Sequence, residues 1–180
     1  MCTNFAKKVE SKTPIVAYKV LSVGLDGSIV TPFARCDITE KMLSGEEELV
    51  ASEGRAPEIS VVGRITNVTL REGYIHTYAD KKSIVYDYFN YYERQAGVGY
   101  WEVAYRVFEV EIPVDSKEDE CWEGIFDDDR CNHSYASKRI RFKREISVDE
   151  LQEWREEMIK EGKLIVEING ALYGKSNNQK

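Results

Sequence analysis

One of the two histidines in the 180-residue chain, His76, lies in the aromatic stretch GYIHTYADKKSIVYDYFNYY. We expect residues 74–78 to form a short strand that runs directly into a helix, with Asp80 placed to cap the first helical turn through its carboxylate. His76, Tyr78 and the backbone amides that begin the helix would then lie together at the mouth of one pocket. Because free amides at the start of a helix bind anions, this mouth would favour a phosphate or another anion.

Two residues of the strand predicted for 14–23 would join this pocket if the two strands are neighbours. The predicted pocket then consists of Tyr18, Lys19, His76, Tyr78 and Asp80. The alternative for His76 is structural, with its ring nitrogens bonded to the backbone or to Tyr78 at the edge of a sheet. No catalytic residue is identified, and whether the protein is an enzyme stays open.

Two oppositely charged segments are the other candidate for function. Residues 115–129 carry eight acids and one lysine, whereas KRIRFKR at 138–144 carries five bases. Either segment could hold a partner, and the alternative is that both are solvated and partly neutralise each other. The predicted partner-binding residues are Asp127, Asp128, Asp129, Arg139, Arg141 and Lys143.

Metal and cofactor sites find little support in the sequence. Cys121, Cys131 and His133 could supply three zinc ligands, but the chain has no C-x-x-C pair, so no metal is predicted and zinc at these residues is left open. Cys2 would become the N-terminal residue if the initiator methionine were removed, and its thiol could then act as a nucleophile. The phosphate-binding, dinucleotide-binding and metalloprotease motifs are absent, and no cofactor is predicted.

Composition narrows the class of protein. A net charge of −7 and a pI near 5.1 argue against general nucleic-acid binding. No apolar run approaches the length of a transmembrane helix, so no membrane partner is expected. The start of the chain lacks the apolar core of a signal peptide, which predicts a cytoplasmic protein.

The order of elements predicts one strand-rich α+β domain over 14–174, with a flexible arm at 1–13 and a tail at 175–180. Its sheet would be central and either mixed or antiparallel. The two main helices are predicted at about 81–96 and 148–161. The second helix opens with Ser147 and Glu150, a capping box.

The strand at 99–113 is apolar on both faces, which predicts a central strand covered on both sides. Residues 135–146 alternate between apolar and basic and are expected to form one strand with a solvated face. Residues 57–70 are expected to form one strand bent at Gly63, and 115–133 a loop. A short helix after Asp37 or Thr39, and a last strand turned at Asn169–Gly170, complete the prediction.

The chain resembles a loose group of small proteins encoded by bacteriophages and mobile elements. The resemblance covers about residues 15–146 and rests on VAYKVL, EGYIHTYADKKSI, YRVFEVEIP and YASKRIRFKREI in that order. The group has no agreed activity. The resemblance implies a phage or mobile-element accessory protein in the host cytoplasm.

A more distant similarity is to the ADP-ribosyltransferase-like fold, in which an early strand, a Gly-x-Tyr element leading to a helix and a Val-x-Glu-Val strand surround NAD. By that similarity Tyr18–Lys19, Tyr74–Tyr78 and Glu109 or Glu111 would surround the ligand. Lys19 stands where that fold carries Arg or His. The similarity therefore implies a degenerate transferase or a nucleotide binder.

Two functions are expected from these features. The first is a non-enzymatic accessory protein, with a role such as counter-defence, that binds a host or phage macromolecule. The second is a nucleotide- or NAD-binding protein with its pocket around His76 and Tyr78. Binding of nucleic acid along Arg139, Arg141 and Lys143 is a third, disfavoured by the net charge. The oligomeric state is left open.

Overall fold

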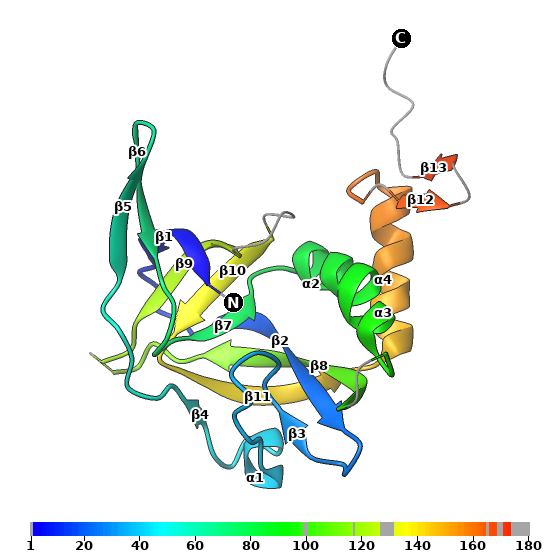
Figure 1. Ribbon diagram of the computed structural model, residues 1–180, viewed down its shortest axis with the longest axis horizontal. Helices are drawn as coiled ribbons and strands as arrows, with labels where there is room; N and C mark the ends of the chain where they lie inside the picture. The colour runs from blue at the N-terminus through cyan, green and yellow to red at the C-terminus, as the bar shows by residue number, and fades with distance from the viewer. Residues whose placement is uncertain are drawn as a thin grey trace.

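A nine-stranded sheet forms the centre of the protein, here a computed structural model (Figure 1). The structure describes residues 2–98, 101–116, 118–126, 132–164, 166–168 and 171–173. Eight strands follow the order β1-β9-β10-β7-β2-β8-β11-β4, and β3 pairs with β2. The strands are β1 (Thr3–Lys8), β2 (Ile15–Gly24), β3 (Ile29–Val30), β4 (Leu49–Val50), β7 (Ile75–Tyr78), β8 (Glu102–Ile112), β9 (Cys121–Phe126), β10 (His133–Ser137) and β11 (Arg139–Ile146).

Every described pair of neighbouring strands is antiparallel, which confirms the predicted α+β class and selects the antiparallel alternative for its sheet. Two separate hairpins complete the strands of the described residues. They are β5 (Glu58–Val62) with β6 (Ile65–Thr69), and β12 (Val166–Ile168) with β13 (Ala171–Tyr173).

Both predicted main helices are present. The first begins as α2 (Lys81–Asp87), continues through the π-helical turn η1 (Tyr88–Tyr92) and ends as α3 (Glu93–Gln95). The second is α4 (Val148–Lys160), where Ser147 accepts a hydrogen bond from the Glu150 amide as the capping box predicts. A short helix, α1 (Glu40–Leu43), is capped by Thr39 rather than Asp37. No described helix is long and apolar enough to span a membrane.

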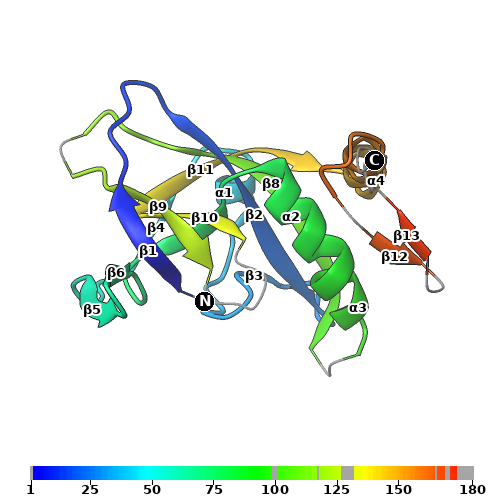
Figure 2. The same ribbon diagram turned by 90° about the horizontal axis from the view of Figure 1, so that it is seen from above.

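The two faces of the central strands belong to different cores, as the apolar pattern of β8 predicts. Val107 packs toward α2 and α4, which lie side by side over one face (Figures 1 and 2). Phe108 and Val110 belong to the opposite core, together with Ile38 and Leu49. Ile38 comes from the segment between β3 and β4 and Leu49 from β4 itself, so a stretch that looks polar in sequence covers one face of the sheet.

The sheet is weakly joined between β2 and β7. These strands pair at one position, Tyr18 opposite Tyr78. If the ladder continued in the same register, Val20 would lie opposite His76, but the strands diverge before that point. The loss of the ladder leaves a gap in the sheet beside Lys19, and the candidate site lies in this gap.

The prediction of a flexible N-terminal arm is wrong. Residues 1–13 were expected to form a flexible arm, but Thr3–Lys8 form strand β1 at the edge of the sheet, paired with β9. Thr3 and Ala6 are buried there. The segment is polar because its remaining side chains face solvent, and that polarity conceals a strand with few buried positions.

Three further strand predictions are wrong in detail. Residues 57–70 form the hairpin β5–β6, with its turn at Gly63, where φ is +65°, rather than one bent strand. Residues 121–126, expected to lie in a loop, form β9, whose Cys121 and Phe126 are buried between acidic neighbours. Residues 135–146, expected to be one strand, divide at Lys138 into β10 and β11, which pair with different strands.

At the C-terminus, β12 and β13 agree with a strand turned near 169–170. The turn residues themselves and the predicted tail at 175–180 lie outside the described residues.

Candidate functional site

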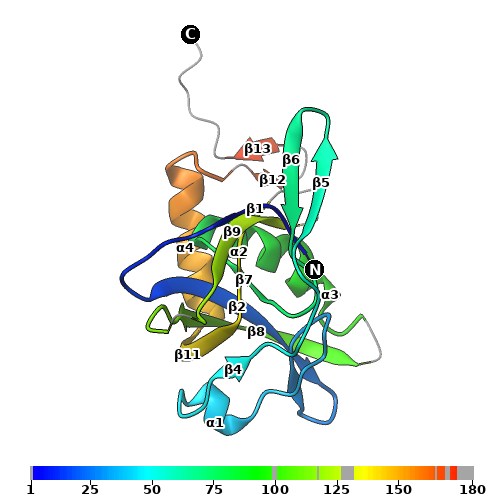
Figure 3. The same ribbon diagram turned by 90° about the vertical axis from the view of Figure 1, so that its left-hand side faces the viewer.

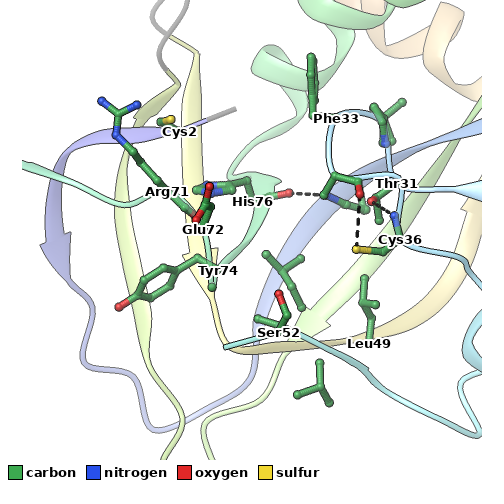
Figure 4. A pocket seen from close by; sticks show the side chains of 18 of the residues that line it. Cys2, Thr31, Phe33, Cys36, Leu49, Ser52, Arg71, Glu72, Tyr74 and His76 are labelled. Carbon is green, nitrogen blue, oxygen red and sulfur yellow. Dashed lines mark hydrogen bonds between the residues drawn. The ribbon is translucent and has the colours of Figure 1, made fainter. Parts of the chain in front are cut away.

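A cavity of about 460 Å³ occupies the gap between β2 and β7. Figure 4 shows His76 between two groups of lining residues, with Arg71 and Glu72 on one side and the Thr31–Cys36 loop on the other. Leu49 and Ser52 form a further wall. Of the five predicted pocket residues, Lys19, His76 and Tyr78 line this cavity, whereas Tyr18 and Asp80 lie elsewhere.

Tyr18 and Lys19 face opposite sides of the sheet because successive side chains of a strand alternate. The ring of Tyr18 packs edge-on against Trp154 of α4, with 5.8 Å between the ring centroids. Lys19 points to the other side and into the cavity. The expectation that both residues face one pocket is therefore corrected by the pleat of β2.

The Lys19 side chain is half-buried, but its ammonium group is enclosed. Nζ donates to the backbone carbonyl of His76 at 2.8 Å. The Lys19 side chain therefore bridges β2 and β7 where the two backbones no longer pair. Among the described residues, no carboxylate forms an ion pair with it. Burial lowers the pKa of Lys19 from 10.5 to about 8, and only a nearby negative charge on Cys36 would act in the opposite direction.

His76 uses both of its ring nitrogens in hydrogen bonds. Nε2 lies 3.1 Å from the Arg71 carbonyl oxygen, which can only accept, so Nε2 carries the proton. Nδ1 then accepts from the Thr3 hydroxyl at 2.9 Å, and that hydroxyl oxygen lies 3.1 Å from Ser134 Oγ. Burial lowers the pKa of His76 to about 4. The ring is therefore neutral near pH 7 and ties β1 to the β6–β7 turn.

Tyr78 anchors the inner wall of the cavity. Its hydroxyl donates to the Asp87 carboxylate at 2.6 Å, and the Tyr92 hydroxyl lies 3.2 Å away. Burial raises the pKa of Tyr78 well above its ordinary value, so the phenol stays protonated as a hydrogen-bond donor. This contact fixes helix α2 against β7 next to the point where β2 and β7 part.

Asp80 performs the predicted capping role away from the cavity. Its carboxylate accepts from the Ser83 amide at 2.8 Å and lies 3.3 Å from His133 Nδ1. The anion site expected at the start of the helix is thus taken up by the protein's own carboxylate.

Two glycines set the shape of the cavity mouth. Gly73 lines the cavity in the β6–β7 turn with φ of +82°, and its backbone lies against that of Gly54. A Cβ added at Gly73 would lie 2.6 Å from the Gly54 Cα. Neither glycine stands out in the sequence, because the contact joins two loops that are distant along the chain.

Sequence reasoning also missed Cys2, Thr31, Phe33 and Arg71 as lining residues. Cys2 was considered only as a free terminal nucleophile, and the other three lie in segments that carry no motif.

The basic stripe of β11 is paired within the molecule. Arg139 contacts Asp119 at 2.6 Å and Glu48 at 2.8 Å, and Arg141 contacts Glu48 at 2.6 Å. Lys143 lies 3.4 Å from Glu111. The hydrogen bond from Arg139 lowers the pKa of Asp119 to about 2, so this pair stays ionised across the physiological range. The predicted partner residues Asp127, Asp128 and Asp129 lie outside the described residues.

Cys121 and His133, two of the three zinc ligands considered from the sequence, lie apart in the structure. Cys121 pairs with Ser137, whereas His133 pairs with Ile125, so they lie four residues apart along the β9–β10 ladder, about 13 Å at the strand rise. Cys131 falls outside the described residues. Within those residues, no group of three His, Cys, Asp or Glu side chains could hold a metal ion.

The β5–β6 hairpin projects from the sheet (Figures 1 and 3) and carries exposed apolar side chains. The side chains of Ile59, Val61, Val62 and Ile65 are each more than half exposed. Ile59 and Val61 lie on one face of the hairpin and Val62 and Ile65 on the other, because successive side chains of a strand alternate.

Searches against protein-family models, curated proteins and solved structures find no match to this chain. The resemblances to phage-encoded proteins and to the ADP-ribosyltransferase-like fold stay predictions.

Proposed function

We propose that the protein binds a small organic anion in the cavity between β2 and β7. One observation carries the proposal: the Lys19 ammonium is enclosed in the cavity, and no described carboxylate pairs with it. A buried charge is costly unless a partner offsets it. The acidic group of a ligand would supply that partner, and its binding would recover part of the cost of enclosing the ammonium.

Arg71 adds a second cation at the exposed edge of the cavity. Its Nε lies 3.2 Å from Glu58, so that carboxylate offsets part of its charge. Glu72, the acid in the lining, lies 3.7 Å from Arg55. The lining therefore has a positive balance in a chain whose net charge is −7.

Nucleotides and sugar phosphates fit these features best. A volume of about 460 Å³ lies within the range of small-molecule sites, which are mostly apolar with a few charged groups. Phe33 offers aromatic surface to a base or ring, while the cations would hold a phosphate. The NAD binding suggested by the ADP-ribosyltransferase-like similarity is one member of this class.

A thermal-shift screen tests the proposal with NAD, ADP-ribose, ribose 5-phosphate and pyridoxine 5′-phosphate, each beside its counterpart without phosphate. A ligand at about 100 times its Kd adds about 2.7 kcal/mol of stability, which raises Tm by about 5–10 °C for a domain of this size. We expect a shift of this order with at least one phosphate compound and a smaller shift with its counterpart.

Two variants assign the shift to the cavity. Lys19→Met should remove most of it, because the apolar side chain fills similar space without the charge. Lys143→Met is the control, because Lys143 is paired with Glu111 and does not line this cavity. Lys138 is also half-buried and also donates Nζ to a backbone carbonyl, but it is unsuited to this role. It bonds to Gly73 at 2.8 Å and lies 3.8 Å from the centre of the Tyr74 ring, and both residues line the cavity. No shift with any compound, or an equal shift in Lys19→Met, would contradict the proposal.

Binding to a host or phage macromolecule is the second proposal, in the accessory role expected from the sequence. The feature that favours it is the exposed apolar hairpin β5–β6, rather than the basic residues of β11, which are engaged in internal ion pairs. The two proposals are compatible because the hairpin and the cavity use different residues.

A further inference from the structure

Lys19 has the surroundings of a reactive amine as well as those of an anion site. Lysine side chains ordinarily keep their ammonium in water while the methylene stem packs on the protein. In this cavity the arrangement is reversed, because Lys19 extends from the middle of the sheet into a space walled by apolar residues. Those walls include Val20, Leu49 and Ile75. An apolar wall stabilises the neutral amine relative to the ammonium.

We propose that Lys19 forms an imine with an aldehyde or ketone ligand that also carries a phosphate or carboxylate. This inference rests on the proposed function, because the ligand must first enter the cavity as an anion. With such a ligand, Arg71 at the exposed edge would hold the acidic group, and the neutral form of Lys19 farther in would meet the carbonyl carbon. Open-chain sugar phosphates and keto acids belong to this class of ligand. A ligand without a carbonyl would instead place its acidic group beside the Lys19 ammonium.

The hydrogen bond to His76 orients the amine for this reaction. A neutral amine has two hydrogens and one lone pair, and one hydrogen stays on the His76 carbonyl at 2.8 Å. The lone pair cannot point at the same carbonyl oxygen, so it is directed elsewhere around Nζ. The carbonyl of His76 thus acts as a positioning group that leaves the nucleophilic electron pair available.

The chemistry balances without an oxidant or reductant. The neutral Nζ attacks the carbonyl carbon and forms the C–N bond, and a proton passes from nitrogen to the carbonyl oxygen through water. The resulting carbinolamine loses water and leaves a C=N bond. The overall change is one amine and one carbonyl compound converted to one imine and one water.

The free-amine fraction supports this assignment. With a pKa of about 8, Lys19 holds an amine fraction at pH 7 about 300 times that of a lysine with the ordinary value of 10.5. A less basic amine is also a weaker nucleophile. We therefore expect a smaller preference in labelling, about tenfold over an ordinary lysine.

Reductive trapping of the wild-type protein tests the inference and does not depend on whether a variant folds. Pyridoxal 5′-phosphate carries both an aldehyde and a phosphate, and borohydride delivers hydride to the imine carbon and fixes the adduct. After digestion, mass spectrometry should find Lys19 labelled about ten times more than Lys138. Pyridoxine 5′-phosphate, which has an alcohol in place of the aldehyde, should suppress this labelling by occupying the cavity.

The outcomes separate the inference from the proposal on which it rests. Stabilisation by pyridoxine 5′-phosphate without an adduct at Lys19 would overturn the imine and leave anion binding intact. Labelling of Lys19 no stronger than that of Lys138, or not suppressed by pyridoxine 5′-phosphate, would also overturn the imine. An absence of both stabilisation by the phosphate compounds and the adduct would overturn the inference and the proposed function together.

Discussion

Gly73→Ala is expected to lower the free energy of unfolding by about 3 kcal/mol, from two separate effects. The φ of +82° is unfavourable for any residue with a Cβ and costs about 1 kcal/mol. The added methyl would also lie 2.6 Å from the Gly54 Cα, and relief of such overpacking costs about 1–3 kcal/mol. Chemical denaturation followed by fluorescence measures the loss. Because the two backbones must separate, the ligand-induced rise in Tm should also fall.

Gly27→Ala is the matched control for this prediction. Gly27 has nearly the same φ, +81°, but no atom lies within 4 Å of the position of an added Cβ. Its substitution should therefore cost only the backbone strain, about 1 kcal/mol. Equal losses in the two variants would show that the contact between Gly54 and Gly73 does not constrain the cavity mouth.

The second large effect is a loss of stability on acidification, caused by His76. The folded-state pKa of about 4 lies below the ordinary value of 6.5. Above pH 6.5 the ring is neutral in both states and the stabilisation is complete. As the pH falls from 6.5 toward 4, the unfolded chain binds a proton that the folded protein does not. The free energy of unfolding should fall by about 3 kcal/mol over this interval.

His76→Gln tests this pH dependence, since the amide keeps a hydrogen-bond donor near Nε2 but does not titrate. The difference in unfolding free energy between pH 7 and pH 4 should be about 3 kcal/mol smaller in this variant than in the wild type. His133→Gln, which removes the other histidine at an exposed position, should retain the wild-type slope within about 1 kcal/mol. If His76→Gln also retained it, His76 would not be the group responsible.

Much of the fold follows from local sequence signals. Asp80 and Ser147 mark the starts of α2 and α4 because a carboxylate or hydroxyl there accepts from the first free amides. The apolar residues on both sides of β8 predict its central place, since only a strand covered on both faces needs them.

The errors arise where a strand is stabilised by distant partners rather than by its own pattern. Strand β1 has few buried side chains and depends on pairing with β9, and β9 in turn lies between acidic residues that mask its alternation. The break at Lys138 is invisible in sequence because β10 and β11 are both apolar enough to continue each other.

The site was predictable in part. His76 was predicted from its place at a strand-to-helix junction, and Lys19 from the expectation that its strand neighbours that of His76. The structure brings the two together through the bond from Nζ to the His76 carbonyl. The early separation of β2 and β7 could not be predicted. It depends on the register of pairing, and the register is a property of the whole sheet. Tyr18 was assigned to the wrong face for a different reason, because successive side chains of a strand alternate and Tyr18 cannot share a face with Lys19.

The most direct test of the central claim is the titration of the Lys19 side chain, followed by NMR through its labelled ε-carbon. Comparison with Lys19→Met assigns the resonance, and Lys143→Met provides a reference. Enclosure of an unpaired ammonium in the cavity predicts a midpoint for Lys19 near pH 8. A phosphate ligand that binds there should move this midpoint upward, since a neighbouring negative charge favours the ammonium. A midpoint at the ordinary value of 10.5, unchanged by every phosphate compound, would contradict the claim.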